Sequence, residues 1–340
     1  QIAKACSAAR VIVTDVGHPF IVKVHQALEK YAAGARRLSY YDNPEAFVPG
    51  GYSAVAAEVM QASQAILFAN ANLSKVPLYK SKEPLQEIDC GQRKRVGIGY
   101  YPIEAVEKMI LRRREAHEMM RKALFLQHSI DDNGQKLLVY FGGNNEEYFS
   151  KAFPAFLEIC KQAMKQGGLS SSVILLQQHP GAKKENRDRK LLEGWIAENK
   201  NDPTAPKAIV GEGSSDDAQV VSDIALYYQT SMGPQFVLAG IPTMQIGHQK
   251  YDDILVANGL APAVTDANQF LAEIQKMKPL PTDGAVKERI LTGLGIEKEW
   301  LTKLKQALEI TPIQKKKRRR HRSSLEPFYK KEYNKRANRK

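Results

Sequence analysis

The stretch from residue 220 to residue 247 constrains the fold of this chain more than any other. An apolar segment of strand length, Ile224 to Tyr228, meets small polar residues; a helix-length apolar segment and a second strand, Thr243 to Ile246, follow. A strand, tight turn, helix and strand in this order predict a parallel α/β unit. In such a unit the turn lies at the carboxyl end of the strand, where helix N–H groups favour phosphate.

The turn of this unit carries residues that suit a phosphate group. Gly233 lets the backbone approach an anion, and the hydroxyls of Thr230 and Ser231 can donate hydrogen bonds to it. Gln235 follows one turn into the helix and is expected to project toward the same crevice. The alternative interpretation is a parallel α/β unit that binds no ligand.

The segment Gln235-Phe-Val-Leu-Ala-Gly240-Ile-Pro242 resembles the E-x-x-x-x-G-x-P segment of GT-B glycosyltransferases and of non-hydrolysing UDP-N-acetylglucosamine 2-epimerases. The resemblance implies two Rossmann-like domains that face a cleft and hold a nucleotide-sugar. It places the ribose at Gln235 and the diphosphate at the residues before it. Gln replaces the Glu of the family pattern here, and an amide can bond a ribose hydroxyl but brings no charge.

Three other strand ends in the second half supply further candidates for the nucleotide site. The apolar run 136–141 enters Gly142 and Gly143, which let the backbone approach a donor phosphate or sugar. The run 172–178 ends at His179-Pro180, which resembles the HP motif of bacterial sialyltransferases and CDP-glycerol-type transferases; that motif implies contact with nucleotide phosphates. The alternative for His179 is an exposed side chain in a proline-defined loop.

The third strand end carries an acidic residue and a helix start. Glu212 follows the strand Lys207 to Val210, and the resemblance implies that it contacts the base. Ser214 or Ser215 is the expected helix cap, and Asp216 and Asp217 suit the first turn of a helix. The sequence therefore predicts a dipole role for these aspartates, and no bound metal.

The first half predicts a second α/β domain with a candidate catalytic pair. The strand at Val11 runs into Asp15-Val-Gly17-His18-Pro19, so His18 begins a helix at the strand's carboxyl edge. The turn is similar to the Gly-His turn of many GT-B acceptor domains, which implies a general base at His18. The alternative is a histidine that bonds locally at the helix start. Asp15 is the one obvious carboxylate beside it.

The net charge of +13 belongs mostly to the end of the chain. Residues 315–340 contain thirteen Lys or Arg and two Glu, a charge of +11, which leaves +2 for the rest. Such a block cannot form a core, so we expect a basic disordered tail, which could bind a polyanion such as nucleic acid or anionic membrane, or an import receptor. A solvated tail without a specific partner is the alternative.

Together these patterns predict an N-terminal acceptor-side domain over residues 1–131, a nucleotide-sugar-binding domain over 132–310 and the tail over 311–340. The expected function is that of a GT-B glycosyltransferase, of hexosyl or sialyl type, with a nucleotide-sugar as donor substrate, an unknown acceptor and no further cofactor. The alternatives are a 2-epimerase-like enzyme and a non-catalytic α/β protein that acts through its tail. Three widely spaced cysteines and the lack of an apolar run of about 18 residues predict a cytoplasmic or membrane-peripheral protein.

Overall fold

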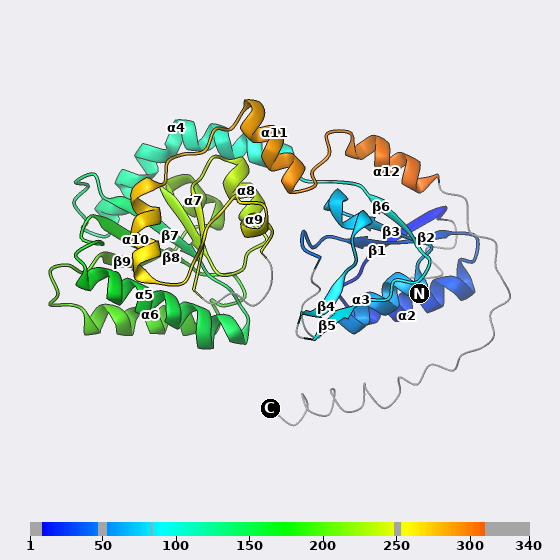
Figure 1. Ribbon diagram of the computed structural model, residues 1–340, viewed down its shortest axis with the longest axis horizontal. Coiled ribbons are helices and arrows are strands. Elements are labelled where there is room, and N and C mark those ends of the chain that lie inside the picture. The colour runs from blue at the N-terminus through cyan, green and yellow to red at the C-terminus, as the bar shows by residue number, and fades with distance from the viewer. Residues whose placement is uncertain (1–8, 47–52, 83, 248–252, 310–340) are drawn as a thin grey trace, which may run out of the picture. The chain divides into compact units, whose positions relative to one another are not determined.

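The computed structural model describes residues 9–46, 53–82, 84–247 and 253–309 of the chain. This part is α/β, with a four-stranded and a six-stranded parallel sheet and a short antiparallel hairpin (Figure 1). The basic tail expected from residue 311 onward lies outside the described residues. Within them, no helix combines the length and the apolar character that crossing a bilayer requires.

The first sheet is built from the early part of the chain. Its strands have the order β1-β2-β3-β6 and are all parallel, with bounds Val11–Asp15, Arg36–Tyr41, Ala65–Phe68 and Lys94–Gly97. Helices α2 (Pro19–Tyr31) and α3 (Ser53–Ala62) connect the first three strands, and the 3₁₀ turn η3 (Ala71–Lys75) follows β3. The hairpin of β4 (Tyr79–Lys82) and β5 (Leu85–Glu87) was not predicted from the sequence.

The second sheet has the strand order β12-β11-β10-β7-β8-β9, and every pair is parallel. Its strands are β7 (Lys136–Phe141), β8 (Ser172–Gln177), β9 (Lys207–Val210), β10 (Ile224–Tyr227), β11 (Thr243–Ile246) and β12 (Ala263–Val264). From β7 the chain adds β8 and β9 on one side and then β10 to β12 on the other. The connection after β7 runs to one side of the sheet and the connection after β10 runs to the other, so the loops after these two neighbouring strands separate. This is the topological switch point, where α/β proteins bind ligands.

Side chains alternate between the two faces of the second sheet. In β7, Leu138 and Tyr140 enter one core and Val139 and Phe141 the other. The first core is covered by α5 (Phe153–Lys165), α6 (Arg187–Glu198) and α10 (Ala267–Lys276). The second is covered by α4 (Ile103–Gln127), α7 (Ser215–Val221), α8 (Gly233–Leu238), α9 (Ile254–Ala257) and α11 (Gly284–Gly293) (Figure 1). Burial on both faces explains why these strands are continuous apolar runs.

Helix α4 packs with the second sheet, although it precedes residue 131. Val106, Met109 and Phe125 share one core with Val139 and Phe141. A domain boundary at residue 131 therefore separates α4 from the sheet that it covers. The division of the chain into domains stays a prediction.

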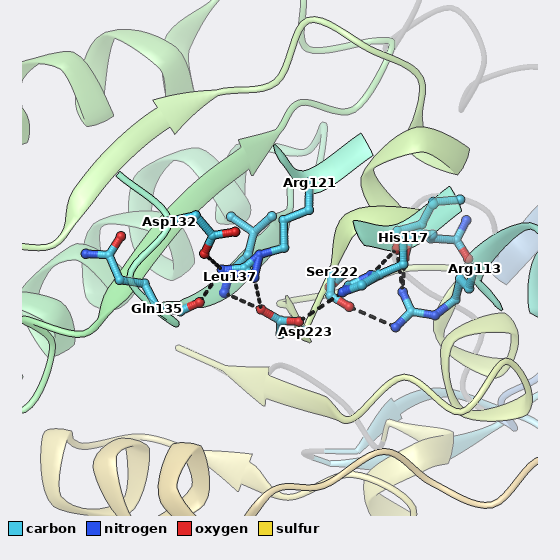
Figure 2. A network of polar contacts seen from close by, with 10 residues as sticks. Arg113, His117, Arg121, Asp132, Gln135, Leu137, Ser222 and Asp223 are labelled. Carbon is cyan, nitrogen blue, oxygen red and sulfur yellow. Dashed lines mark hydrogen bonds and ion pairs between the residues drawn. The ribbon is translucent and has the colours of Figure 1, made fainter. Parts of the chain in front are cut away.

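A polar network joins α4 to the amino ends of β7 and β10 (Figure 2). The Arg113 guanidinium donates to the carbonyls of Gln219, Val220 and Ser222, which end α7. His117 Nδ1 lies 2.8 Å from Val220 O, and His117 Nε2 lies 3.5 Å from Asp223 Oδ1. Charged residues in the middle of a helix are typical of a solvated face, but Arg113 and His117 both face the end of α7, because residues spaced by four share one side of a helix.

Asp223 is the centre of this network. Its Oδ2 accepts a hydrogen bond from Leu137 N at 2.7 Å and lies 3.6 Å from Arg121 Nη1. Arg121 also pairs with Asp132 at 3.0 Å. One carboxylate thus connects α4, the start of β7 and the start of β10.

The last described segment returns to the first sheet. Ala71 N donates to Gly295 O and Glu297 N donates to Gly99 O, each at 2.9 Å. Gly295 has a φ of 63°, and a Cβ there would clash with Asn70, so this contact requires glycine. Helix α12 (Trp300–Leu308) follows, and Arg36 Nη2 donates to Ala307 O at 2.7 Å.

Candidate nucleotide site at the carboxyl edge of the second sheet

Four loops leave the second sheet side by side at its carboxyl edge. The last residue of β7, Phe141, pairs with Gln177 of β8 and with Tyr227 of β10, and Val210 of β9 pairs with Leu176 of β8. The loops that begin at residues 142, 178, 211 and 228 are therefore neighbours. Every residue predicted for the nucleotide site lies on one of these loops or in α8, which follows the loop after β10.

Hydrogen bonds connect the loops after β7, β9 and β10 to one another and to the last residue of β8. Asn145 Nδ2 donates to Gln229 Oε1 at 3.0 Å, which connects the loops after β7 and β10 across the switch point. Gly142 N donates to Gln177 O at 2.9 Å, and Gln177 Nε2 donates to Gly213 O at 3.3 Å. The sequence indicated the strand ends but not the amide bridge between Asn145 and Gln229.

His179 is held with one ring nitrogen available as a donor. Its exposed side chain follows β8, and its Nδ1 accepts a hydrogen bond from Gly181 N at 3.0 Å. A neutral imidazole whose Nδ1 accepts carries its proton on Nε2. The His179-Pro180 turn therefore leaves His179 with an Nε2–H group that can donate a hydrogen bond to a phosphate oxygen.

The loop after β10 presents hydroxyl groups. Thr230 Oγ1 accepts a hydrogen bond from Met232 N at 3.1 Å, so its own O–H can still donate, and Ser231 is exposed. Gly233 is buried, and a Cβ there would lie 2.9 Å from Leu255 Cδ1, so close packing accounts for this glycine. Gln235 is half-buried, one turn into α8.

The two glycines after β7 also have a packing role. A Cβ on Gly142 would lie 2.8 Å from Tyr148 Oη, and a Cβ on Gly143 would lie 2.9 Å from Tyr148 Cγ. Tyr148 begins the π-helical turn η4 (Tyr148–Ala152) and is wholly buried, which places its pKa well above the ordinary value. The sequence reasoning missed Tyr148, because an aromatic residue near a strand end carries no signal of its own.

Glu212 is exposed on the loop after β9. The helix that follows begins as predicted, since Ser214 Oγ accepts from Asp217 N and the Asp217 carboxylate accepts from Ser214 N, both at 3.1 Å. The hydrogen bonds from Ser214 and the pairing with Arg112 lower the pKa of Asp217 against the effect of burial. Ser214 and Asp217 thus form a capping box at the start of α7.

The structure places Asp15 and His18 at the carboxyl end of β1. His18 is the N-cap of α2, and its Nδ1 accepts a hydrogen bond from Phe20 N at 3.1 Å. Asp15 Oδ1 accepts from Gly17 N at 2.8 Å, which closes the turn between them. Because its Nδ1 accepts a hydrogen bond, a neutral His18 carries its proton on Nε2. His18 can therefore act as a base only after Nδ1 releases the backbone N–H of Phe20.

Two further observations concern metal sites and cavities. Among the described residues, no group of three or more His, Cys, Asp and Glu side chains is arranged to hold a metal ion. A cavity of about 400 Å³ adjoins the network of Figure 2, and its lining includes Arg113, Arg114, His117 and Asp223. None of the residues predicted for the nucleotide site lines it.

Comparisons with known proteins bear on the fold. No protein-family model matches this sequence, and no curated protein sequence matches it. Among solved structures, trehalose 6-phosphate synthase from Burkholderia multivorans is similar, with a TM-score of 0.56 and 14% identity over 90% of this chain and 73% of the other. The chain has a GT-B-like fold.

Other structures with a GT-B-like fold agree with this assignment. UDP-GlcNAc 2-epimerase from Neisseria meningitidis, solved with UDP-GlcNAc, has a TM-score of 0.55 and 12% identity over 90% of this chain and 78% of the other. A glycosyltransferase from Rickettsia africae has a TM-score of 0.55 and 11% identity over 91% and 79%. At these identities the likeness concerns the fold, and the HP motif stays a prediction.

Proposed function

We propose that this chain is a GT-B glycosyltransferase that binds a nucleotide-sugar at the carboxyl edge of the second sheet and transfers the sugar to an acceptor. The observation that carries the proposal is the meeting of four loops with hydrogen-bond donors at the switch point between β7 and β10. The structures with the same fold include a trehalose 6-phosphate synthase and a UDP-GlcNAc 2-epimerase bound to UDP-GlcNAc.

Each group has a role that follows from its chemistry. The Nε2–H of His179 and the hydroxyls of Thr230 and Ser231 donate to the donor phosphates, while Gln235 bonds the ribose and Glu212 contacts the base. Gly143 lets the backbone approach the phosphate or sugar. As the glycosidic bond breaks, negative charge grows on the leaving phosphate, and donors that are already aimed at it stabilise the transition state without a metal.

The acceptor side is assigned to the turn at the end of β1. His18 takes the proton of the acceptor hydroxyl once its Nδ1 releases Phe20 N, and Asp15 holds the turn in place. The sugar is of hexosyl or sialyl type. The protein works in the cytoplasm or at the membrane surface.

Nucleotide binding by the full chain is the direct test. Thermal unfolding is followed with UDP, CMP, CDP, GDP and their sugars, and a ligand at 100 times its Kd should stabilise the folded chain by about 2.7 kcal/mol. The variant Ser231→Ala with His179→Ala should bind the best ligand about 10²- to 10⁴-fold more weakly, since each hydrogen bond to a charged group contributes about 1.5 to 3 kcal/mol.

Ser171→Ala is the matched control, because Ser171 is exposed and precedes β8 at the opposite edge of the sheet. It should bind nucleotide as the wild type does. Equal affinity of the double variant and the wild type would remove these residues from the site. Nucleotide binding without transfer or hydrolysis of any donor sugar would favour the non-catalytic alternative.

A further inference from the structure

A wholly buried carboxylate lies beneath the candidate nucleotide site. Asp188 is the second residue of α6, and its oxygens accept hydrogen bonds from Tyr148 Oη at 3.1 Å, Gln178 Nε2 at 2.7 Å and Arg189 N at 2.9 Å. No Lys, Arg or His of the described residues forms an ion pair with it within 4.0 Å. The three donors come from the turn after β7, the end of β8 and α6 itself.

This carboxylate connects the loops that carry the proposed phosphate ligands. Tyr148 packs directly under the Gly142-Gly143 turn, where a Cβ on Gly142 would also lie 3.1 Å from Asp188 Oδ2. Tyr148 N donates a hydrogen bond to Asn145 Oδ1 at 2.8 Å, and Asn145 in turn bridges to Gln229. On the other side, Gln178 immediately precedes His179.

Stability alone gives little reason to bury this group. Removing a carboxylate from water is costly, and its three hydrogen bonds do no more than offset part of that cost. Apolar side chains of similar size often stabilise a core as well or better. A fully bonded polar group does fix the distances between the elements that it joins.

We propose that Asp188 is a positioning residue of the donor site. Through Tyr148 and Gln178 it sets the spacing between the Gly142-Gly143 turn and the His179 donor, and thereby the affinity for the diphosphate of the nucleotide. The inference rests on the proposed function, since the site that Asp188 positions is the one proposed to bind the donor.

The core supplies a matched pair of variants. Tyr148 and Tyr140 are both wholly buried, with ring centroids 6.3 Å apart. Tyr148 Oη bonds to Asp188, whereas Tyr140 Oη makes no hydrogen bond to any described residue. Tyr148→Phe and Tyr140→Phe therefore remove the same atom from the same core, but only Tyr148→Phe breaks the positioning contact.

The test is calorimetric titration of the full chain with the nucleotide, among UDP, CMP, CDP and GDP, that the wild type binds best. Tyr148→Phe should weaken binding about 10-fold and Tyr140→Phe less than 2-fold, since one bond to a charged acceptor is lost in the first alone. Asp188→Leu should weaken it more than Asp188→Asn, because the amide still bonds Gln178 and Tyr148. Urea unfolding should rank the two differently, with Asp188→Leu at least as stable as Asp188→Asn.

The different rankings of Asp188→Leu and Asp188→Asn by nucleotide affinity and by stability distinguish a positioning role from a purely structural one. If affinity and stability fall together across the four variants, Asp188 is a structural residue and the inference is wrong. The same conclusion follows if Tyr148→Phe binds nucleotide as the wild type does, and the proposed function then still stands. A wild-type chain that binds none of the four nucleotides overturns the proposed function and the inference with it.

Discussion

Replacing Asp223 with Ala should release α4 from the second sheet at its amino edge. The side chain accepts a hydrogen bond from Leu137 N at 2.7 Å and lies 3.5 Å from His117 Nε2 and 3.6 Å from Arg121 Nη1 (Figure 2). The substitution removes all three contacts. The backbone N–H of Leu137, at the start of β7, then lacks its side-chain acceptor.

The expected loss in the free energy of unfolding follows from these contacts. A hydrogen bond from a backbone N–H to a charged acceptor contributes about 1.5 to 3 kcal/mol. The two ion pairs are partly exposed, since the Asp223 side chain keeps 27% of its exposure, so each adds about 0.2 to 1 kcal/mol. The sum is about 2 to 5 kcal/mol, a large share of the stability of an ordinary domain.

The loss should also depend on pH. The hydrogen bond to Asp223 raises the pKa of His117 above its ordinary value in the folded state, against the effect of burial. Burial alone would raise the pKa of Asp223, but its bonds to His117 and Leu137 and the charge of Arg121 lower it, so Asp223 stays ionised in mild acid. The His117 contribution is therefore fully present below a pH of about 6.5 and is lost as pH rises through the folded pKa.

Urea unfolding of the full chain at about pH 5.5 and about pH 8.5 measures both effects. Asp131→Ala is the matched control, because Asp131 is exposed on the turn after α4, and it should change the free energy by less than about 0.5 kcal/mol. A change of that size in Asp223→Ala, or a larger loss at the higher pH, would refute this account of the network.

Three further predictions concern other parts of the chain. His18→Ala should lower turnover about 10²- to 10⁴-fold and leave donor affinity unchanged in calorimetry; wild-type turnover would exclude His18 as the base. Deletion after Pro312 should keep nucleotide affinity but abolish salt-dependent binding to nucleic acid or anionic vesicles, and retained binding would place the polyanion surface in the body of the protein. Burial raises the pKa of the thiols of Cys90 and Cys160, so a thiol reagent should label these two only after unfolding; rapid labelling of Cys90 or Cys160 in the native chain, located by peptide mass, would contradict their burial.

The strand ends could be predicted from the sequence because strands buried on both faces form apolar runs that stop abruptly. The run 136–141 stops at Gly142 and has these bounds as β7, whereas the run 172–178 extends one residue beyond β8, which ends at Gln177. Parallel order then places their carboxyl ends at one edge without further information. The fold class and the general location of the candidate site follow from these two facts.

Contacts between residues distant in the chain could not be predicted in this way. Asp188 and Tyr148 are 40 residues apart, and neither the helix start at Asp188 nor the aromatic run at Tyr148 indicates a buried pair. Arg113 and His117 lie in a charged helical stretch that looks solvated, but their partners, the carbonyls at the end of α7 and, for His117, Asp223, follow more than 100 residues later in the chain. The hairpin of β4 and β5 was missed because Leu85–Glu87 is exposed throughout and has no alternation of apolar and polar residues.

The return of the last described segment to the first sheet has a consequence for synthesis on the ribosome. Gly99 and Ala71 are made early, but their partners Glu297 and Gly295 follow only about 200 residues later. At about 5 to 20 residues per second the first sheet waits roughly 10 to 40 s for these contacts, while all strands of the second sheet have already been translated. The half of the protein that is made first is thus the half that is completed last, and a chaperone that holds nascent chains would meet it in an unfinished state.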